Sequence, residues 1–352
     1  MERIHIAFFG PTNSGKSTLV NAIAGQQVSL VSDVPGTTTD PVRKLIELPG
    51  LGPCVLIDTA GLDDVSVLGA ERRRLTLSVL DETDVAVVVN ADTSGTLAEM
   101  ILKAGVPVVH YSRGESVESL LERITAAVPK EEDRFLTGDL VKSGDTVLLV
   151  MPQDSEAPKG RLILPQVQVL RELLDRGCNP VCCTPDSLPS ALAALKALPA
   201  LTITDSQVFA RVNQALPATA PLTSFSVLLA AAKGDAAVFA EGAKAIDRLT
   251  RGARVLIAEA CTHVPNTEDI GRVKIPALLR KKADVQVEIA AGNDFPEDLT
   301  PYDLIIHCGA CVATRTLVRA RMRKALLAGV PFTNYGIALA YLQGMLDRIV
   351  IP

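Results

Sequence analysis

The segment Gly10–Ser17 constrains this chain most, because it is a complete G-x-x-x-x-G-K-S. An apolar run at residues 4–9 precedes it and helical spacing follows at residues 18–23, which is the strand, loop and helix order of a phosphate-binding loop. Glycines let the loop's N–H groups surround a phosphate, Lys16 adds a positive charge, and Ser17 can ligate Mg²⁺. The sequence therefore predicts a nucleotide-binding α/β domain. The residues expected to contact the nucleotide are Gly10, Asn13, Ser14, Gly15, Lys16, Ser17, Thr18, Asp58 and Gly61.

A second element, Asp58-Thr59-Ala60-Gly61, ends the apolar run 54–57 and places a carboxylate at the tip of a predicted strand. Asp58 can hold Mg²⁺ through water there, and the Gly61 N–H can reach the γ-phosphate. The loop 35–40 lies between the two motifs, and its Thr38 hydroxyl is suited to complete the Mg²⁺ shell. The candidate catalytic residues are Lys16, Ser17, Thr38, Asp58 and Gly61.

Composition limits the class of protein. The 352 residues are 48% hydrophobic and 21% charged, which suits a globular chain of two or three domains. A net charge of −5 argues against a dedicated nucleic-acid binder, and no apolar run approaches the roughly 18 residues of a membrane helix. The N-terminus reads directly into a strand, without the layout of a signal peptide. We therefore expect a cytoplasmic protein that binds neither nucleic acid nor membrane.

The rest of the chain alternates strands and helices, which predicts parallel sheets with crossover helices. A charged connector at 129–134 marks the first boundary. The apolar section 140–217 is too small to cover both faces of a sheet, which favours a module that dimerises. The fold class is therefore α/β with three domains, at 1–130, 140–222 and 235–352. Predicted strands lie at 105–109, 146–151, 179–183, 201–204, 255–260, 285–290, 304–306 and 331–334, and predicted helices at 116–128, 165–176, 188–197, 224–232 and 235–249, the last two joined by Lys233-Gly234.

Cysteine and histidine gather behind two strands of the third section. Cys261 and His263 follow the predicted strand 255–260, and His307, Cys308 and Cys311 follow or end the strand 304–306. Both groups are expected at the same edge of one parallel sheet, the edge where such sheets bind ligands. Seven cysteines, an odd number, favour metal binding by reduced thiols over a disulfide framework. The ligand set suits tetrahedral Zn²⁺ or a [4Fe–4S] cluster equally well.

Several other residues have a structural interpretation. Cys54, Cys178, Cys182 and Cys183 are interpreted as core thiols, since strand cysteines usually behave as small hydrophobes. The loop 158–161 is interpreted as a turn, with an anion site as the alternative. Arg315, Arg319 and Arg323 share one helix face, which is either solvated or, with Arg272 and Lys274, a docking patch.

The three N-terminal motifs resemble the potassium-dependent members of the translation-factor-related GTPases. The resemblance implies binding of GTP and GDP, K⁺ ligation by Asn13, and slow hydrolysis that K⁺ accelerates; a capping role is the alternative for Asn13. The guanine-reading N-K-x-D of that class is absent after the strand 105–109, where Glu115 is the candidate replacement.

The pattern C-x-H … H-C-x-x-C behind a P-loop domain resembles the [FeFe]-hydrogenase maturation GTPases of the HydF type. The segments 158–165, 222–226, 258–263, 270–276 and 333–336 also match the character of that family. The resemblance implies a P-loop GTPase domain, a dimerisation domain and an iron–sulfur cluster-binding domain in a homodimeric scaffold. It further implies a [4Fe–4S] cluster on Cys261, Cys308 and Cys311, with His263 or His307 as the fourth ligand or as a donor that orients a cysteine.

In such a carrier the cargo is a diiron precursor that bears CO and CN⁻. Two radical-SAM maturases build the precursor, and the carrier delivers it to apo-[FeFe]-hydrogenase. Two other functions compete with this one. The first is a regulatory or ribosome-associated GTPase with a structural zinc site, and the second is a redox enzyme that uses the cluster for electron transfer.

Overall fold

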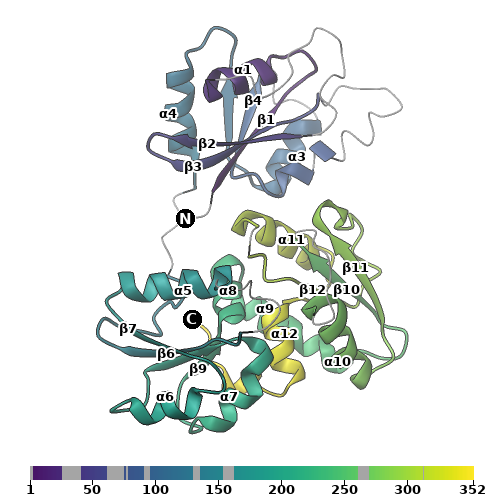
Figure 1. Ribbon diagram of the computed structural model, residues 1–352. Coiled ribbons are helices and arrows are strands. Elements are labelled where there is room, and N and C mark those ends of the chain that lie inside the picture. The colour runs from purple at the N-terminus through teal and green to yellow at the C-terminus, as the bar shows by residue number, and fades with distance from the viewer. Residues whose placement is uncertain are drawn as a thin grey trace. The chain divides into compact units, whose positions relative to one another are not determined.

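A computed structural model describes residues 3–25, 41–61, 75–76, 78–90, 96–129, 135–153, 162–260, 269–311 and 313–352. The chain divides into two compact units, Met1–Glu132 and Asp133–Pro352, and each is described by itself (Figure 1). Within the described residues, no helix is both long enough and apolar enough to cross a membrane.

The first unit is a five-stranded sheet in the order β2-β3-β1-β4-β5, parallel except for the β2–β3 pair. Helices cover both faces (Figure 1). Apolar residues of α1 and α4 pack on one face, and those of α3 and of the segment around Val79 and Leu80 pack on the other. Its elements are β1 Ile4–Phe9, α1 Lys16–Ala24, β2 Val42–Leu48, β3 Gly52–Asp58, β4 Val85–Val89, α3 Thr96–Ala104, β5 Val108–Tyr111 and α4 Val117–Ala127.

The second unit contains two four-stranded parallel sheets. The first has the order β7-β6-β8-β9, with α5 and α8 on one face and α6 and α7 on the other. The C-terminal segment lies beside this sheet, because the Val350 N–H donates to the Leu222 carbonyl of β9. Its elements are β6 Thr146–Val150, α5 Leu164–Asp175, β7 Asn179–Cys183, α6 Leu188–Ala194, β8 Leu201–Thr204, η1 Ser206–Val208, α7 Phe209–Ala215, β9 Leu222–Ser224 and α8 Phe225–Lys233.

The second sheet has the order β11-β10-β12-β13, with α10 and α12 on one face and α9 and α11 on the other. Helix α9 lies very close to β13, because a Cβ on Gly242 would be 2.1 Å from the Phe332 carbonyl oxygen. The elements are α9 Ala236–Ala243, η2 Lys244–Arg248, β10 Arg254–Glu259, η3 Ile270–Lys274, α10 Ile275–Lys282, β11 Gln286–Ala291, η4 Gly292–Asp294, β12 Leu304–His307, α11 Arg315–Leu327, β13 Phe332–Asn334, α12 Tyr335–Leu342 and η5 Leu346–Arg348.

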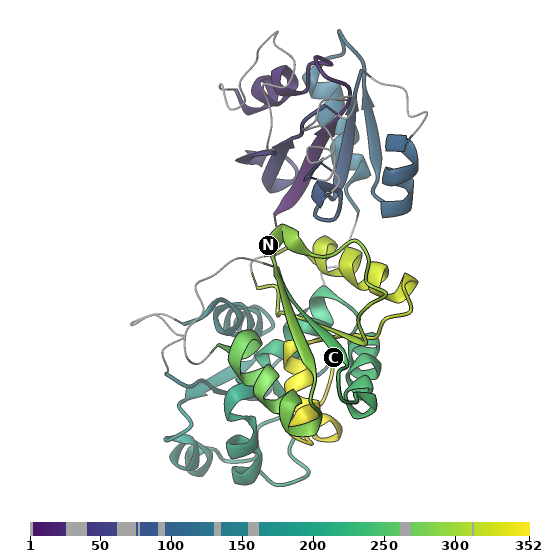
Figure 2. The ribbon, with the colours of Figure 1, turned by 90° about the vertical axis from the view of Figure 1, so that its right-hand side faces the viewer.

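The two sheets of the second unit repeat one architecture. In each, the first strand pairs with the second and third, the third pairs with the fourth, and a helix follows the fourth strand directly. That helix begins the same way in both halves: Ser224 caps α8 by accepting from the Val227 N–H, and Asn334 caps α12 by accepting from the Ile337 N–H. The halves meet where α8 packs against α12 (Figures 1 and 2). One apolar core runs through both halves.

The predicted α/β architecture with parallel sheets is confirmed. Three predicted elements were wrong in detail. The helix expected at 188–197 ends earlier, at Ala194, because the backbone of Leu195 is extended. The strand expected at 105–109 is β5, Val108–Tyr111, because Gly105 at φ +67° and Pro107 form the turn before it. The helix expected at 235–249 is α9 followed by a separate 3-10 turn at Lys244–Arg248.

One expected core thiol was also wrong. Cys182 is exposed, because β7 is an edge strand of its sheet and successive side chains of a strand point to opposite faces. Cys54 and Cys178 are buried as expected, and burial raises the pKa of each thiol. Cys183 is half-buried.

Candidate functional site

The phosphate loop between β1 and α1 has the backbone shape that its glycines predict. Gly10, Asn13 and Gly15 have φ values of +155°, +60° and +95°. A Cβ at Gly10 would be 2.6 Å from the Val89 carbonyl oxygen, so only glycine fits beside β4. The loop therefore turns sharply from the strand into the helix, which is the arrangement that leaves N–H groups for a phosphate.

Lys16 is hydrogen-bonded to the backbone of this loop. Its side chain is only 6% exposed, and Nζ donates to the carbonyl oxygens of Gly10 at 3.1 Å and Pro11 at 2.7 Å. The ammonium group is therefore held at the mouth of the loop, where a phosphate would meet both the charge and the helix N-terminus.

The two predicted Mg²⁺ residues lie together. Ser17 Oγ donates to Asp58 Oδ2 at 2.6 Å, and the Asp58 carboxylate is fully buried at the carboxyl end of β3. Gly61 lies against Thr12, since a Cβ on Gly61 would be 2.2 Å from Thr12 Oγ1. The first turn of α1 and the end of β3 thus form one small oxygen-rich site.

The remaining phosphate-loop candidates occupy different positions. Ser14 Oγ is buried and has no hydrogen-bond partner among the described residues. Asn13 and Thr18 are exposed. Thr38 lies outside the described residues.

Beyond the phosphate loop, the turn after β5 occupies the place of the missing N-K-x-D. Glu115 accepts from the Ser112 N–H at 3.4 Å, and its carboxylate is ion-paired with Arg123. The candidate replacement for the guanine-reading aspartate is therefore already engaged within its own turn.

Asn90 at the end of β4 joins this turn to the phosphate loop. Its Nδ2 donates to the Ser14 carbonyl at 2.7 Å, and its Oδ1 accepts from the Arg113 N–H at 2.7 Å. The residue has φ +47°, a left-handed conformation that asparagine tolerates better than most side chains. No motif in the sequence predicts this role for Asn90, and its position at a strand end is the one local indication.

The second candidate site lies at the carboxyl edge of the sheet in the C-terminal half. Cys308 follows β12 directly, and β12 pairs with β10 in parallel. Cys308 Sγ accepts from the N–H groups of Ala260 at 3.1 Å and Ala310 at 3.4 Å. Donors of this kind favour the thiolate form of a cysteine, which is the form that binds metals.

The other predicted ligands divide into two groups. Cys311 is exposed in the same loop as Cys308. Cys261 and His263 lie outside the described residues, although Ala260, the residue just before them, is the one that donates to Cys308. Among the described residues, no group of three or more His, Cys, Asp or Glu could hold a metal ion.

His307 is fully buried, and both of its ring nitrogens are engaged. Nδ1 lies 2.8 Å from the Cys308 carbonyl oxygen, which can only accept, and Nε2 lies 3.3 Å from an Arg321 guanidinium nitrogen, which can only donate. These partners define a neutral imidazole with the proton on Nδ1. Burial, and next the charge of Arg321, lower the pKa of His307 to about 3.

Two buried cations, Arg321 and Lys233, support this edge, and no sequence motif predicts a functional role for either. Arg321 donates to the carbonyl oxygens of Glu259 at 3.2 Å and Gly292 at 2.5 Å. Lys233, at the end of α8, donates to the cysteine loop from a position 77 residues away in sequence. No local pattern indicates a contact over such a separation.

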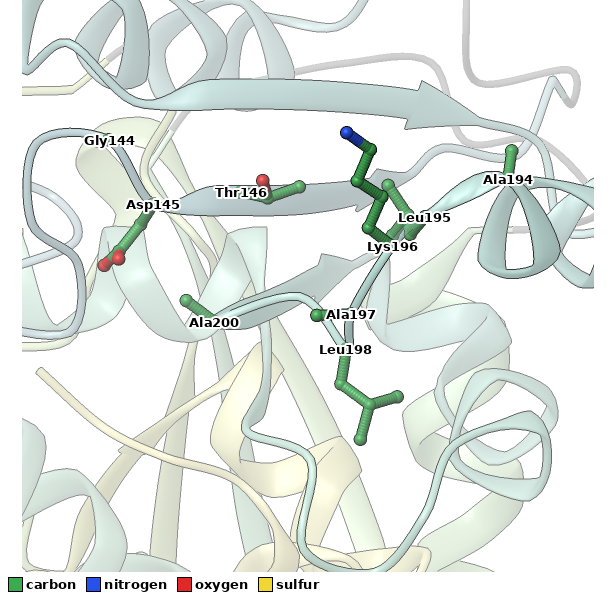
Figure 3. Close-up of a pocket in the computed structure, with 9 residues that line it drawn as sticks. All are labelled: Gly144, Asp145, Thr146, Ala194, Leu195, Lys196, Ala197, Leu198 and Ala200. Carbon is green, nitrogen blue, oxygen red and sulfur yellow. The ribbon is translucent and has the colours of Figure 1, made fainter.

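A hollow of about 470 Å³ lies elsewhere in the second unit, at the amino ends of β6 and β8. Figure 3 shows its lining, which includes Asp145, Lys196 and Leu198. The candidate site lies at carboxyl ends of strands, so this hollow is separate from the chemistry described above.

Three family descriptions match the chain. "50S ribosome-binding GTPase" matches residues 5–112, "Hydrogen maturase F dimerization domain" matches 136–234, and "Hydrogen maturase F tetramerization domain" matches 237–352. The phosphate loop and doubly wound sheet thus define the first unit as a GTPase domain. The chain belongs to the hydrogen maturase F family, the HydF-type hydrogenase maturation GTPases.

Curated relatives resemble the GTPase domain alone. The tRNA modification GTPase MnmE of Chromobacterium violaceum is 35% identical over 133 residues, which are 37% of this chain and 25% of that protein. MnmE of Nitrosospira multiformis is 48% identical over 80 residues, or 22% and 18% of the two chains. The chain therefore matches about a quarter or less of the length of these relatives.

Among solved structures, a crystal structure of an Aquifex aeolicus Era variant bound to GDP.AlF4⁻ is 18% identical. The alignment covers 56% of this chain and 99% of that one, with a TM-score of 0.30.

Proposed function

We propose that this protein is a GTP-hydrolysing carrier that holds a [4Fe–4S] cluster, receives a diiron precursor of the hydrogenase active site, and delivers it to apo-[FeFe]-hydrogenase. Radical-SAM maturases are the partners that supply the cargo. The observation that carries the proposal is the double N–H donation to Cys308 Sγ, in a chain of the hydrogen maturase F family that also has a complete phosphate loop. These two donors support Cys308 as a metal ligand, and the residue lies in a different unit from the nucleotide site.

In the GTPase domain, 1–130, the loop N–H groups and Lys16 bind the β- and γ-phosphates of GTP. Ser17 ligates Mg²⁺ directly, Asp58 does so through water, and Thr38 completes the shell. The 2.6 Å bond between Ser17 and Asp58 supports this assignment, because it joins the two groups that a shared cation would need. Gly61 directs its N–H to the γ-phosphate, and Asn13, exposed on the loop, ligates K⁺.

The cluster-binding domain, 235–352, holds the [4Fe–4S] cluster through the thiolates of Cys261, Cys308 and Cys311. When bound, the cluster supplies an iron with an exchangeable fourth position, which can accept another metal fragment. The protein's own groups hold and orient the thiols. The engagement of both ring nitrogens favours His307 as a residue that orients Cys308, which leaves His263 as the candidate fourth ligand.

The section 140–222 is the dimerisation domain, and the active form is a homodimer. The family description of residues 136–234 as a dimerization domain supports this, and that of residues 237–352 as a tetramerization domain adds a second level of assembly.

Anaerobic reconstitution with iron and sulfide tests the proposal. The protein should become brown, absorb near 400 nm and contain about four iron atoms per chain. Cys308→Ser should lose iron and colour while it hydrolyses GTP at the wild-type rate, because the two sites lie in separate units. Cys182→Ser, which removes an exposed thiol of β7, is the matched control and should retain both properties.

A GTPase with a structural zinc site is the second candidate, since three thiolates and a histidine also suit Zn²⁺. Stoichiometric zinc with no iron after reconstitution would favour that function and overturn the carrier.

A further inference from the structure

Lys233 carries a buried charge at the end of α8. Its side chain is only 7% exposed, and Nζ donates to the carbonyl oxygens of Ala310 at 2.5 Å and Ala313 at 2.7 Å, with that of Cys311 at 3.5 Å. An ammonium group has three donors, and taking it out of water costs several kcal/mol unless acceptors replace the water. Three backbone carbonyls of one loop supply the replacement here.

The loop that Lys233 holds is the one that contains Cys308 and Cys311. Ala310, between these two cysteines, has φ +49°, a left-handed conformation that is unfavourable for a non-glycine residue. Its carbonyl accepts from Lys233, and its N–H donates to Cys308 Sγ at 3.4 Å. The ammonium group therefore fixes Ala310 from one side while Ala310 directs its N–H to the sulfur on the other.

The repeated architecture shows that the fold alone does not require this lysine. Ser224 and Asn334 cap the corresponding helices α8 and α12, and the residues nine positions after these caps are Lys233 and Gln343. Gln343 is exposed, and the loop after β8, which corresponds to the cysteine loop, has no cysteine. Of the two equivalent positions, the buried lysine therefore occurs only at the one that contacts a cysteine-containing loop.

We infer that Lys233 is a positioning residue of the metal centre. It holds the cysteine loop in the conformation that presents N–H groups to the Cys308 thiolate, and its charge favours the more negative, reduced state of a bound cluster. The effect of the charge on a bound cluster rests on the proposed function. The role of Lys233 in holding the loop does not depend on it. Lys233 lies within the dimerization-domain match and its loop within the tetramerization-domain match, so the contact also joins these two parts.

The test compares Lys233→Met, which retains the length and removes the charge, with Lys244→Met, which removes an exposed lysine paired with Glu241. In the apo protein, hydrogen exchange at the amides of Ala310 and Ala313 should become at least about tenfold faster in Lys233→Met, because a bond to a charged group is worth more than 1.4 kcal/mol. In the reconstituted protein, iron loss to a chelator should accelerate and the cluster midpoint potential should become more negative. Lys244→Met should match the wild type in all three measurements.

The double variant Lys233→Met/Ala310→Gly separates the two roles. Glycine adopts positive φ without strain, so exchange and iron retention should recover in part. The midpoint potential should remain shifted, because the charge is still absent. Unchanged exchange in Lys233→Met would overturn the inference, whether or not a cluster forms. Changed exchange without any iron binding would retain the loop role and refute the proposed function instead.

Discussion

The Ser17 hydroxyl donates to Asp58 Oδ2 at 2.6 Å, which joins the first turn of α1 to the carboxyl end of β3. Because both groups are expected on one Mg²⁺ ion, Ser17→Ala should weaken Mg·GTP binding by roughly tenfold to a hundredfold, the range for losing a bond to a charged group. Titration of a fluorescent GTP analogue with Mg²⁺ and with EDTA measures the effect. Wild type and variant should converge in EDTA, and Ser190→Ala, an exposed serine of α6, is the control. A loss of equal size in EDTA would contradict the Mg²⁺ role.

Potassium dependence tests Asn13. This residue has φ +60°, so Asn13→Gly removes the carboxamide without straining the backbone, whereas alanine would confound the result. The wild type should hydrolyse GTP faster in KCl than in NaCl at equal ionic strength. Asn13→Gly should show a rate ratio near one when both rates are measured at saturating GTP. If the variant keeps its potassium stimulation, Asn13 has only the capping role.

The nucleotide site lacks the N-K-x-D motif, and substitutions of Asn90 test whether its side-chain bonds contribute to GTP binding instead. Asn90→Gly tolerates φ +47° but deletes both side-chain bonds, so the affinity for GTP should fall about tenfold. Asn90→Asp retains the acceptor for the Arg113 N–H and loses the donor to the Ser14 carbonyl. Comparison of the two variants by isothermal titration shows which bond matters. If both variants bind GTP as tightly as the wild type, the two side-chain hydrogen bonds of Asn90 do not contribute to nucleotide binding.

Thiol reactivity checks the division of the cysteines. In the native apo protein, maleimide should label Cys182 and Cys311, which are exposed, much faster than Cys54 and Cys178, which are buried. Peptide-resolved mass spectrometry measures each rate, and labelling in denaturant gives the reference. Rapid native labelling of Cys54 would contradict its position in the core of the first unit.

Much of the fold could be predicted from local pattern. The strand before the phosphate loop and the strand Leu201–Thr204 have the predicted bounds, because short runs rich in apolar residues next to turns define buried strands well. The boundaries of β5 were less accurate, since Val106 extends the apolar run across the turn at Pro107. The exposure of Cys182 depends on the order of strands in the sheet, which the residues of β7 alone do not reveal.

The two candidate sites also contain some contacts that the sequence predicted and others that it did not. Motif spacing predicted that Ser17 and Asp58 would share one Mg²⁺ site, and the two groups are in contact. The parallel strands predicted that residues 261–263 and 307–311 would share one sheet edge, and Cys308 accepts from the Ala260 N–H there. The cations behind the second site could not be predicted, because Lys233 reaches the cysteine loop only through the packing of α8 against the other half of the unit. The helix carrying Arg315, Arg319 and Arg323 was recognised as basic, but its buried arginine, Arg321, lies off that face.

The most direct test of the central claim is activation of apo-[FeFe]-hydrogenase. The reconstituted protein, incubated with the radical-SAM maturases and their substrates and then repurified, should confer hydrogen evolution on the apo-enzyme. Cys308→Ser treated identically should confer none, and Cys182→Ser should match the wild type. Equal activation by the wild type and Cys308→Ser, or none by a wild-type protein that carries its full complement of iron, would contradict the proposed carrier.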